Sequence, residues 1–192
     1  MEGGGADGFR EYCDAPAMRE FYALSSAVSR KTYQQRLLDA GIPQGKSFPV
    51  ELERRAAKGQ VRGYVLLHKH VPVAYGLCYV HGDTLTLDKM GFDPDYAYTN
   101  AGTVLTYFII QRLFAAQQFR IFDFGSGHYE YKALFATNSV RCADVIFMRP
   151  TLLNLTTALS HSGLNTISEL LKHLLEVFGL KARVRRLIHR RL

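Results

Sequence analysis

The stretch that decides the fold runs from Asp88 to Lys132. It contains the loop Tyr96-Ala-Tyr-Thr-Asn-Ala-Gly102, a long apolar helix, the segment Phe119–Phe124 and the polar turn Gly125-Ser-Gly-His-Tyr-Glu-Tyr-Lys132. This order places the start of a helix between two strands. The first amides of a helix have no intrahelical acceptors, and the helix macrodipole adds about half a positive charge there. The stretch therefore predicts a site near Gly102 that suits an anion such as a pyrophosphate or a carboxylate.

The composition fits one globular domain with its own core. The chain has 192 residues, of which 47% are hydrophobic and 21% charged, and a chain of this length normally buries well over half of its unfolded surface. The net charge of +7 is concentrated in a tail without acidic residues, which contains Lys181, Arg183, Arg185, Arg186, Arg190 and Arg191. Because the body is nearly neutral, the domain is not expected to bind DNA, and attraction to polyanions or membrane surfaces is confined to the tail.

Cysteine usage and the N-terminus predict a cytoplasmic protein. Cys13, Cys78 and Cys142 are odd in number and lack CxxC spacing, which is typical of free thiols in a reducing compartment and not of a disulfide framework or a zinc site. Met1–Asp7 contains neither a basic region nor an apolar run. No later segment approaches the roughly 18 consecutive apolar residues of a membrane span, so neither secretion nor insertion is expected.

The first half of the chain predicts a strand, two helices and a meander. Phe9–Cys13 alternates like a short strand, and Asp14 with Pro16 marks the entry to a helix. A second helical segment, Pro49–Lys58, ends at Gly59. Three strands joined by tight connections form an antiparallel meander: Val61–His68, Val73–Val80 and Thr84–Lys89.

The second half predicts a helix against the sheet and a buried strand. The helix Gly102–Ala116 carries a wide apolar stripe. Phe119–Phe124 is nearly continuously apolar, which is typical of a parallel strand buried on both faces. A short helix through Leu134 and Phe135 and a strand at Ala143–Met148 follow. The order of elements predicts an α+β fold with a mixed central sheet flanked by helices.

A more helical sequence begins at Pro150. Thr151–Leu159 is a helical piece, and Thr166-Ile-Ser-Glu169 is a capping box ahead of a further helix that ends at Gly179. This pair of helices is expected to pack on the sheet as a lid or to form the contact of a homodimer.

Several phrases resemble the GNAT acyltransferase superfamily. They are the polar block Ser29-Arg-Lys-Thr-Tyr-Gln34, Asn100-Ala-Gly-Thr-Val-Leu105 and Phe122-Asp-Phe-Gly-Ser-Gly-His-Tyr-Glu-Tyr-Lys132, within the order of elements above. The chain looks most like the cellulose-biosynthesis-type (CelD-like) acetyltransferases, whose relatives include the Fem-type peptidoglycan aminoacyltransferases. The resemblance implies a single GNAT-like domain over residues 8–150, a C-terminal helical extension over 151–180 and a basic tail over 181–192.

The resemblance implies that acetyl-CoA or another acyl-CoA enters between the fourth and fifth strands. In this chain those strands are Thr84–Lys89 and Phe119–Phe124. The superfamily's pyrophosphate loop is Arg or Gln, two residues, Gly, one residue, then Gly or Ala; here Tyr98-Thr-Asn-Ala-Gly102-Thr103 stands in its place. The cofactor-binding residues are expected to be Tyr98, Asn100, Ala101, Gly102 and Thr103. An ordinary loop with a helix cap is the alternative.

Three residues are the catalytic candidates. Tyr131 matches by position the tyrosine that protonates the leaving thiolate in the superfamily, and Tyr129 is second to it and a candidate for substrate binding. Asp88 is a base candidate by its strand and facing, and His128 could relay a proton because it titrates near neutral pH. The alternatives are tyrosines that cover the sheet edge, a strand-end surface acid and a solvated loop histidine.

The basic side chains, Asp123 and two histidines are the remaining residues with a predicted role or an alternative to one. Lys132 could neutralise a phosphate or the carboxylate of the acceptor. Arg30 and Lys31 could contact an anionic acceptor, with a charged, solvated helix end as the alternative. Asp123 is expected to orient the turn that follows it through hydrogen bonds. His68 and His70 share one strand face without a nearby carboxylate, so no metal is proposed.

The leading functional prediction is an N-acyltransferase, most simply an N-acetyltransferase, that acts on the amine of a small-molecule or sugar-amine acceptor. One alternative is Fem-like aminoacyl transfer from aminoacyl-tRNA, with the basic tail contacting tRNA. Another is a catalytically degenerate GNAT-like binding module whose tail lies on a membrane surface. The glycine turn lacks both Gly-x-Ser-x-Gly and GxGxxG, which disfavours a serine hydrolase and a dinucleotide enzyme.

Overall fold

The computed structural model describes residues 8–32, 41–127, 130–143, 145, 147–149, 151, 154, 156, 157 and 160. The chain divides into two compact units, Met1–Val140 and Arg141–Leu192. The strands of the first unit are β1 (Phe9–Tyr12), β2 (Val61–His68), β3 (Val71–His81), β4 (Thr84–Phe92) and β5 (Ile121–Asp123). Its helices are α1 (Ala15–Ser29), α3 (Ser47–Ala56), the 3-10 helix η1 (Pro94–Thr99), α4 (Ala101–Ala116) and α5 (Glu130–Phe135).

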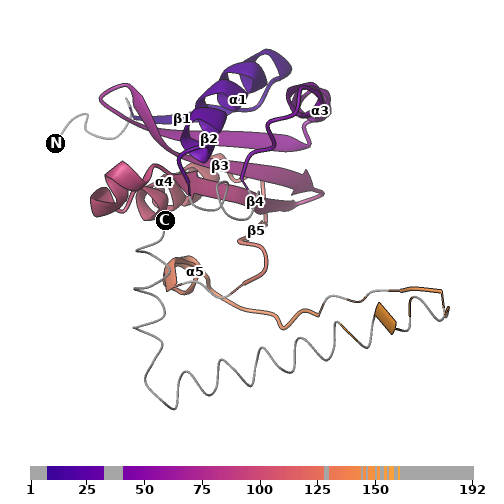
Figure 1. Ribbon diagram of the computed structural model, residues 1–192. Helices are drawn as coiled ribbons and strands as arrows, with labels where there is room; N and C mark the ends of the chain where they lie inside the picture. The colour runs from indigo at the N-terminus through magenta and orange to yellow at the C-terminus, as the bar shows by residue number, and fades with distance from the viewer. Residues whose placement is uncertain are drawn as a thin grey trace, which may run out of the picture. The chain divides into compact units, whose positions relative to one another are not determined.

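The strands form one mixed sheet in the order β1-β2-β3-β4-β5. The pairs β1–β2, β2–β3 and β3–β4 are antiparallel, and β5 pairs with β4 in parallel. Figure 1 shows α1 and α3 on one face of the sheet and α4 on the other. The predicted α+β fold with a mixed sheet between helices is therefore confirmed.

Each face of the sheet has its own core. On one face, Met18 and Phe21 of α1 pack completely buried against strand residues such as Val65. On the other face, Leu105 and Ile109 of α4 pack against Leu85. Burial of each such side chain stabilises the fold by about 1.5–3 kcal/mol relative to its exposure, so the two layers fix both helices on the sheet.

The start of α1 follows the signal that predicted it. The Asp14 side chain is the N-cap and accepts a hydrogen bond from the Ala17 amide at 2.8 Å, while Pro16 lies in the first turn. An aspartate cap satisfies one of the orphan amides of the helix, and proline is preorganised for this position. The predicted entry at Asp14 is therefore confirmed.

The fourth strand differs from the prediction in length and in register. β4 runs past Lys89 to Phe92 and pairs with β3 until Ala74 faces Phe92. Leu77 faces Lys89 and Cys78 faces Leu87, so Asp88 is the extra residue of a β-bulge. The bulge changes which residues face α4, and Met90 joins the core on that face. Simple alternation from Leu85 could not predict the continuation because the bulge breaks the period of two.

One strand prediction is confirmed only in part, because β5 pairs in parallel as predicted but is shorter and more exposed, and a second strand prediction is wrong. The segment Phe119–Phe124 does not form a strand buried on both faces, because β5 covers only Ile121–Asp123 and Ile121 is 49% exposed. β5 has β4 as its one strand neighbour in the described part of the sheet, which leaves its other side open. The predicted strand Ala143–Met148 is also absent at its described positions, where the chain is irregular and Phe147 lies exposed.

The C-terminal predictions are tested only at a few positions. Asn154, Thr156 and Thr157 are helical, as the helical piece at Thr151–Leu159 predicted. The capping box Thr166–Glu169, the last helix and the basic tail lie outside the described residues. Within the described ranges, no helix combines the length and the apolarity that a membrane crossing requires.

Gly63 provides a test of the core between α1 and the sheet. A Cβ at Gly63 would lie 2.6 Å from Cγ of the buried Phe21 ring. Gly63→Ala is expected to lower the free energy of unfolding by about 1–3 kcal/mol, because the ring must move within a packed core. The matched control is Gly45→Ala, where a Cβ meets only Ser47 Oγ at 3.7 Å. Equal stability of both variants by urea denaturation would contradict this packing.

Candidate active site

β4 and β5 pair at their starts and then separate. Their parallel register joins Thr84 to Ile121, Leu85 to Phe122 and Thr86 to Asp123. β5 ends there, whereas β4 continues to Phe92. The chains are still close at the next position, since a Cβ at Gly125 would lie 3.2 Å from the Leu87 carbonyl oxygen. Beyond this point β5 no longer covers the edge of β4, and that edge can bind an extended ligand.

Asp88, the predicted base, lies at the point where the two strands part. It is the bulged residue of β4 and its side chain is exposed. Bulges commonly re-aim a side chain next to an active site. Burial raises the pKa of Cys78 and of Tyr79. The negative charge of Asp88 is the second cause and raises both pKa values further. Cys78 is consequently a protonated buried thiol and no candidate nucleophile.

The start of α4 lies against the end of β4. Gly102 lies beside the end of β4, where a Cβ would make ordinary van der Waals contacts at 3.4 Å from Phe92 Cδ1 and 3.8 Å from Met90 Cε. Asn100 precedes the helix in the left-handed conformation, with φ 52° and ψ 40°, and its side chain makes no cap hydrogen bond. Asparagine tolerates this conformation better than most residues. The helix thus begins beside the part of β4 that β5 leaves uncovered.

The amides of Ala101, Gly102 and Thr103 have no acceptor within the helix. The first intrahelical bond runs from the Val104 amide to the Asn100 carbonyl at 3.0 Å. The three preceding amides, together with the helix macrodipole, provide the donor set that an anion needs. Four of the five predicted cofactor-binding residues therefore lie at the start of α4, namely Asn100, Ala101, Gly102 and Thr103.

Tyr98, the fifth of these residues, belongs to η1. It is strongly exposed and stacks on Tyr96, with ring centroids 6.4 Å apart. Tyr96 in turn contacts His68 in an edge-type arrangement, with ring centroids 5.7 Å apart. Tyr98 therefore presents an aromatic face to solvent just before the helix start, and His68 belongs to this aromatic group. The described part of the chain contains no group of three or more His, Cys, Asp and Glu residues able to hold a metal ion.

The turn after β5 is held by two charged side chains. Asp123 Oδ1 accepts a hydrogen bond from the Gly125 amide at 2.8 Å, which confirms the prediction that Asp123 orients the turn. Lys132 Nζ donates to the carbonyls of Gly125 and Ser126 at 3.1 and 2.6 Å. Burial lowers the pKa of Lys132, and the nearby Asp123 opposes this effect. In this structure Lys132 binds the turn, and binding of an anion by Lys132 stays a prediction.

The remaining candidates lie in different surroundings. Tyr131 is half-buried on α5 and meets Phe124 edge-on, with centroids 6.4 Å apart, so it follows the strand separation on the β5 side. His128 and Tyr129 lie outside the described residues. Arg30 caps the end of α1 and donates to Gln44 Oε1 at 3.2 Å. The contacts of Arg30 thus tie α1 to the segment before α3.

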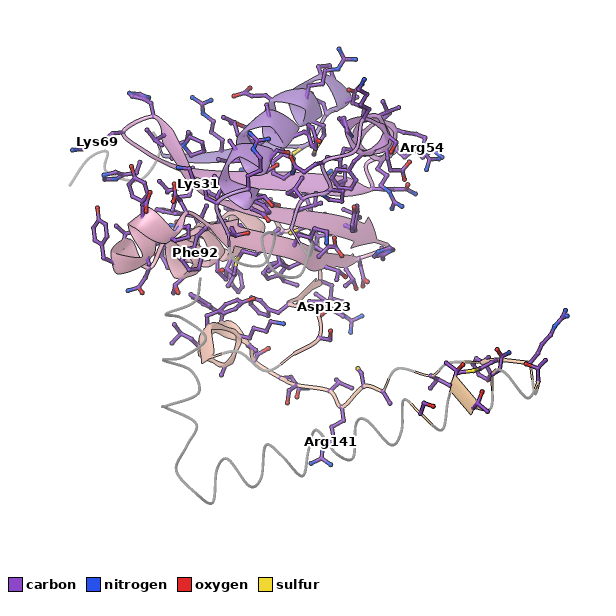
Figure 2. All side chains as sticks on the ribbon, in the orientation of Figure 1. Lys31, Arg54, Lys69, Phe92, Asp123 and Arg141 are labelled. Carbon is purple, nitrogen blue, oxygen red and sulfur yellow. The ribbon has the colours of Figure 1, made fainter. Side chains whose placement is uncertain are left out.

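One charged pair was not predicted from the sequence. Asp93, directly after β4, accepts a hydrogen bond from Lys31 Nζ at 2.6 Å, and its side chain is 1% exposed. Asp93 Oδ1 also accepts from the Asp95 amide at 3.1 Å as the N-cap of η1. Figure 2 shows Lys31 and Phe92 at the same end of the sheet. The Asp-Pro pair at 93–94 signals a helix start, but its distant partner could not be read from it.

Comparison with known proteins identifies this arrangement. The family model described as an acetyltransferase (GNAT) domain matches residues 3–133. The chain belongs to this family. The GNAT acetyltransferases use acetyl-CoA, so the GNAT domain described here is an acetyltransferase with acetyl-CoA as its cosubstrate. The cellulose-biosynthesis-type branch stays a prediction. No curated protein sequence matches the chain.

Solved structures share the fold of this GNAT domain. An aminoglycoside acetyltransferase from an uncultured soil metagenomic sample, in complex with sisomicin, has a TM-score of 0.52 at 11% identity, over 73% of this chain and 95% of that chain. A possible acetyltransferase from Clostridium difficile 630 has a TM-score of 0.50 at 8% identity, over 76% of this chain and 99% of that chain. At these identities the likeness concerns the fold alone.

The residues present fit acetyl-CoA. A pyrophosphate needs several backbone donors at a positive helix end, which Ala101, Gly102 and Thr103 supply. The amide groups of the pantetheine arm can bind to a strand edge, and in the described part of the sheet β4 does not pair with β5 beyond Thr86. The GNAT domain therefore has the donor set for both parts of this cosubstrate in one place.

Lys132→Met separates the two roles open to Lys132. If the ammonium mainly holds the turn, the variant is expected to lose about 1–2 kcal/mol of unfolding free energy with little change in acetyl-CoA affinity, because two hydrogen bonds from a charged donor are lost. Urea denaturation and isothermal titration calorimetry measure the two quantities. Unchanged stability together with weakened acetyl-CoA binding would show that Lys132 acts on the anion instead.

Proposed function

We propose that this GNAT domain transfers the acetyl group of acetyl-CoA to the amine of a small or sugar-like acceptor. The observation that carries the proposal is the separation of β5 from β4 beside the start of α4. Within the family, the phrases Asn100–Leu105 and Phe122–Lys132 support a place in the cellulose-biosynthesis-type branch. The proposal divides the site into a phosphate end at α4 and a reacting end at the β4 bulge.

At the phosphate end, the amides of Ala101, Gly102 and Thr103 bind the pyrophosphate. Backbone amides need no Arg or Gln side chain for this purpose, which accounts for a loop that lacks one. The exposed ring of Tyr98 lies two residues before Asn100 and borders this end. The edge of β4 from Asp88 onward binds the amide-bearing arm in the manner of an added strand.

At the reacting end, this chain supplies a base and an acid. Acetyl-CoA supplies the activated thioester; a C–N bond forms as the C–S bond breaks. Asp88, at the exposed bulge, accepts the proton that the acceptor amine must lose. The Tyr131 hydroxyl, on the β5 side of the separation, donates a proton to the leaving sulfur. General acid and base groups of this kind contribute about 10²–10⁴-fold each.

A sugar-amine acceptor is the class to test first. The aminoglycoside acetyltransferase whose fold resembles this one is in complex with sisomicin. The exposed carboxylate of Asp88 at the reacting end also favours an acceptor that carries amines, because opposite charges attract and hold the acceptor near the base.

The direct experiment combines binding and turnover. Isothermal titration calorimetry with acetyl-CoA and longer acyl-CoAs measures binding, and release of the CoA thiol in the presence of amino sugars and simple amines measures transfer. The proposal predicts saturable binding of acetyl-CoA and thiol release that depends on the amine. Absence of binding to any thioester would overturn it.

Tyr131→Phe tests the assignment of the acid. The variant is expected to lower kcat by about 10²-fold, because phenylalanine cannot protonate the thiolate, while the Kd for acetyl-CoA stays within a factor of about two. Tyr107→Phe is the matched control, since Tyr107 is an exposed tyrosine on the outer side of α4. A Tyr131→Phe enzyme as fast as its parent would remove Tyr131 from the mechanism.

A further inference from the structure

Asp93 is a buried carboxylate at the connection between β4 and the helix start. All of its polar groups are occupied. Its amide donates to the Val73 carbonyl at 2.8 Å, and its carbonyl accepts from the Tyr96 amide at 2.9 Å. Its two carboxylate oxygens accept from the Asp95 amide and from Lys31 Nζ. A residue held by four hydrogen bonds is fixed in position and in side-chain orientation.

A continuous series of hydrogen bonds runs from Asp93 to the start of α4. Asp93 caps η1. Within η1, Thr99 Oγ1 donates to the Tyr96 carbonyl at 2.7 Å, and the Asn100 amide donates to the Ala97 carbonyl at 3.1 Å. The Asn100 carbonyl then accepts the first bond of α4. These bonds connect the position of Asp93 to the amides at the start of α4, in addition to the core packing of Leu105 and Ile109.

Lys31 holds Asp93 from the opposite face of the sheet. It follows α1, which packs on the face that α4 does not cover, and its amide bonds to the Val28 carbonyl at 3.0 Å. The Lys31 side chain is 53% exposed, while that of Asp93 is 1% exposed. The hydrogen bond that Lys31 donates to Asp93 is the largest cause that raises the pKa of Lys31, so the Lys31 ammonium stays protonated. Figure 2 shows Lys31 at this end of the sheet.

The negative charge of Asp93 makes the Lys31–Asp93 ion pair relevant to phosphate binding at the start of α4. An uncompensated buried carboxylate in the connection before α4 repels a phosphate that approaches the helix start, and it is itself costly to bury. Lys31 cancels that charge and fixes the connection at the same time.

We propose that Lys31 and Asp93 form a positioning pair for the amides of α4 that bind the phosphates of the cosubstrate. The inference rests on the proposed function, because it concerns the same acetyl-CoA site. The pair sets affinity for the phosphate-bearing part of the cosubstrate and leaves the reacting end unchanged. Neither residue is assigned to the chemical step.

Lys31→Met is the test, with two ligands compared. S-acetylpantetheine carries the thioester without the pyrophosphate. The variant is expected to bind acetyl-CoA about tenfold more weakly, because a charge-assisted hydrogen bond is lost, while its affinity for S-acetylpantetheine stays within about twofold of the parent's. The KM for acetyl-CoA should rise by the same factor at an unchanged kcat. Lys31→Arg, which retains the charge, should restore most of the acetyl-CoA affinity.

Arg19→Met is the matched control on the same helix. Arg19 pairs with Glu53 through bonds of 2.7 and 3.1 Å, and this pair joins α1 to α3. Loss of an α1 ion pair that does not touch the connection before α4 should leave the affinity for both ligands unchanged. If Lys31→Met does not fold, the double variant Lys31→Met/Asp93→Asn, which removes both charges, is measured in its place.

The outcomes separate this inference from the proposed function. Unchanged acetyl-CoA affinity in a folded Lys31→Met protein overturns the inference while the proposed function stands. Equal loss for acetyl-CoA and S-acetylpantetheine also overturns it, because a general structural role would act on both ligands. A parent protein that binds neither ligand overturns the proposed function and this inference with it.

Discussion

β3 holds β4 along its whole length, whereas β5 holds it only at its start. The antiparallel register with β3 extends to Phe92, and the parallel register with β5 stops at Thr86 and Asp123. Because β3 fixes one side of β4, β4 continues as a strand to Phe92 although the described pairing with β5 ends at Thr86. The bulge at Asp88 marks the point where the two sides begin to differ. The exposed carboxylate of Asp88 therefore lies on the part of β4 that no longer pairs with β5.

The position of the helix start depends on this strand as well. α4 is anchored by Leu105 and Ile109 in the core, and Gly102 lies close to Phe92 at the end of β4. Its first amides thus lie near the uncovered part of β4, and the Lys31–Asp93 pair links the connection between them to α1. Packing on both faces of the sheet and the Lys31–Asp93 ion pair together fix the helix start that we propose to bind the pyrophosphate, so little reordering would be needed when the ligand binds.

Much of this organisation could be predicted from the sequence, and the limits have physical causes. Local signals such as the Asp14 cap and the hydrophobic period of α4 predicted the order of the strands and α-helices from β1 to α5, because caps and periodicity act within one or two turns. The bulge at Asp88 interrupts the two-residue alternation of β4, so the continuation of this strand could not be predicted from Leu85 and Leu87. The exposure of Ile121 depends on what does or does not pair with β5, which the apolar composition of the strand could not reveal.

The residues of the candidate site also fall into two classes, those that local sequence signals predict and those whose partners depend on tertiary packing. The amides of Ala101–Thr103 belong to a helix start, so their position was predictable, and the turn bond of Asp123 is equally local. The partner of Asp93 lies 62 positions earlier in the chain, at Lys31, and the bonds of Lys132 to the turn carbonyls depend on how α5 folds back. Contacts of this kind are set by tertiary packing and leave no periodic trace in the sequence.

The most direct test of the account is a crystal structure of the protein with bound acetyl-CoA. The account predicts the pyrophosphate on the amides of Ala101, Gly102 and Thr103, the pantetheine arm along β4 beyond Asp88, and the thioester between Asp88 and Tyr131. Density for acetyl-CoA at another place, or β4 and β5 joined beyond Thr86 so that the edge is closed, would contradict it.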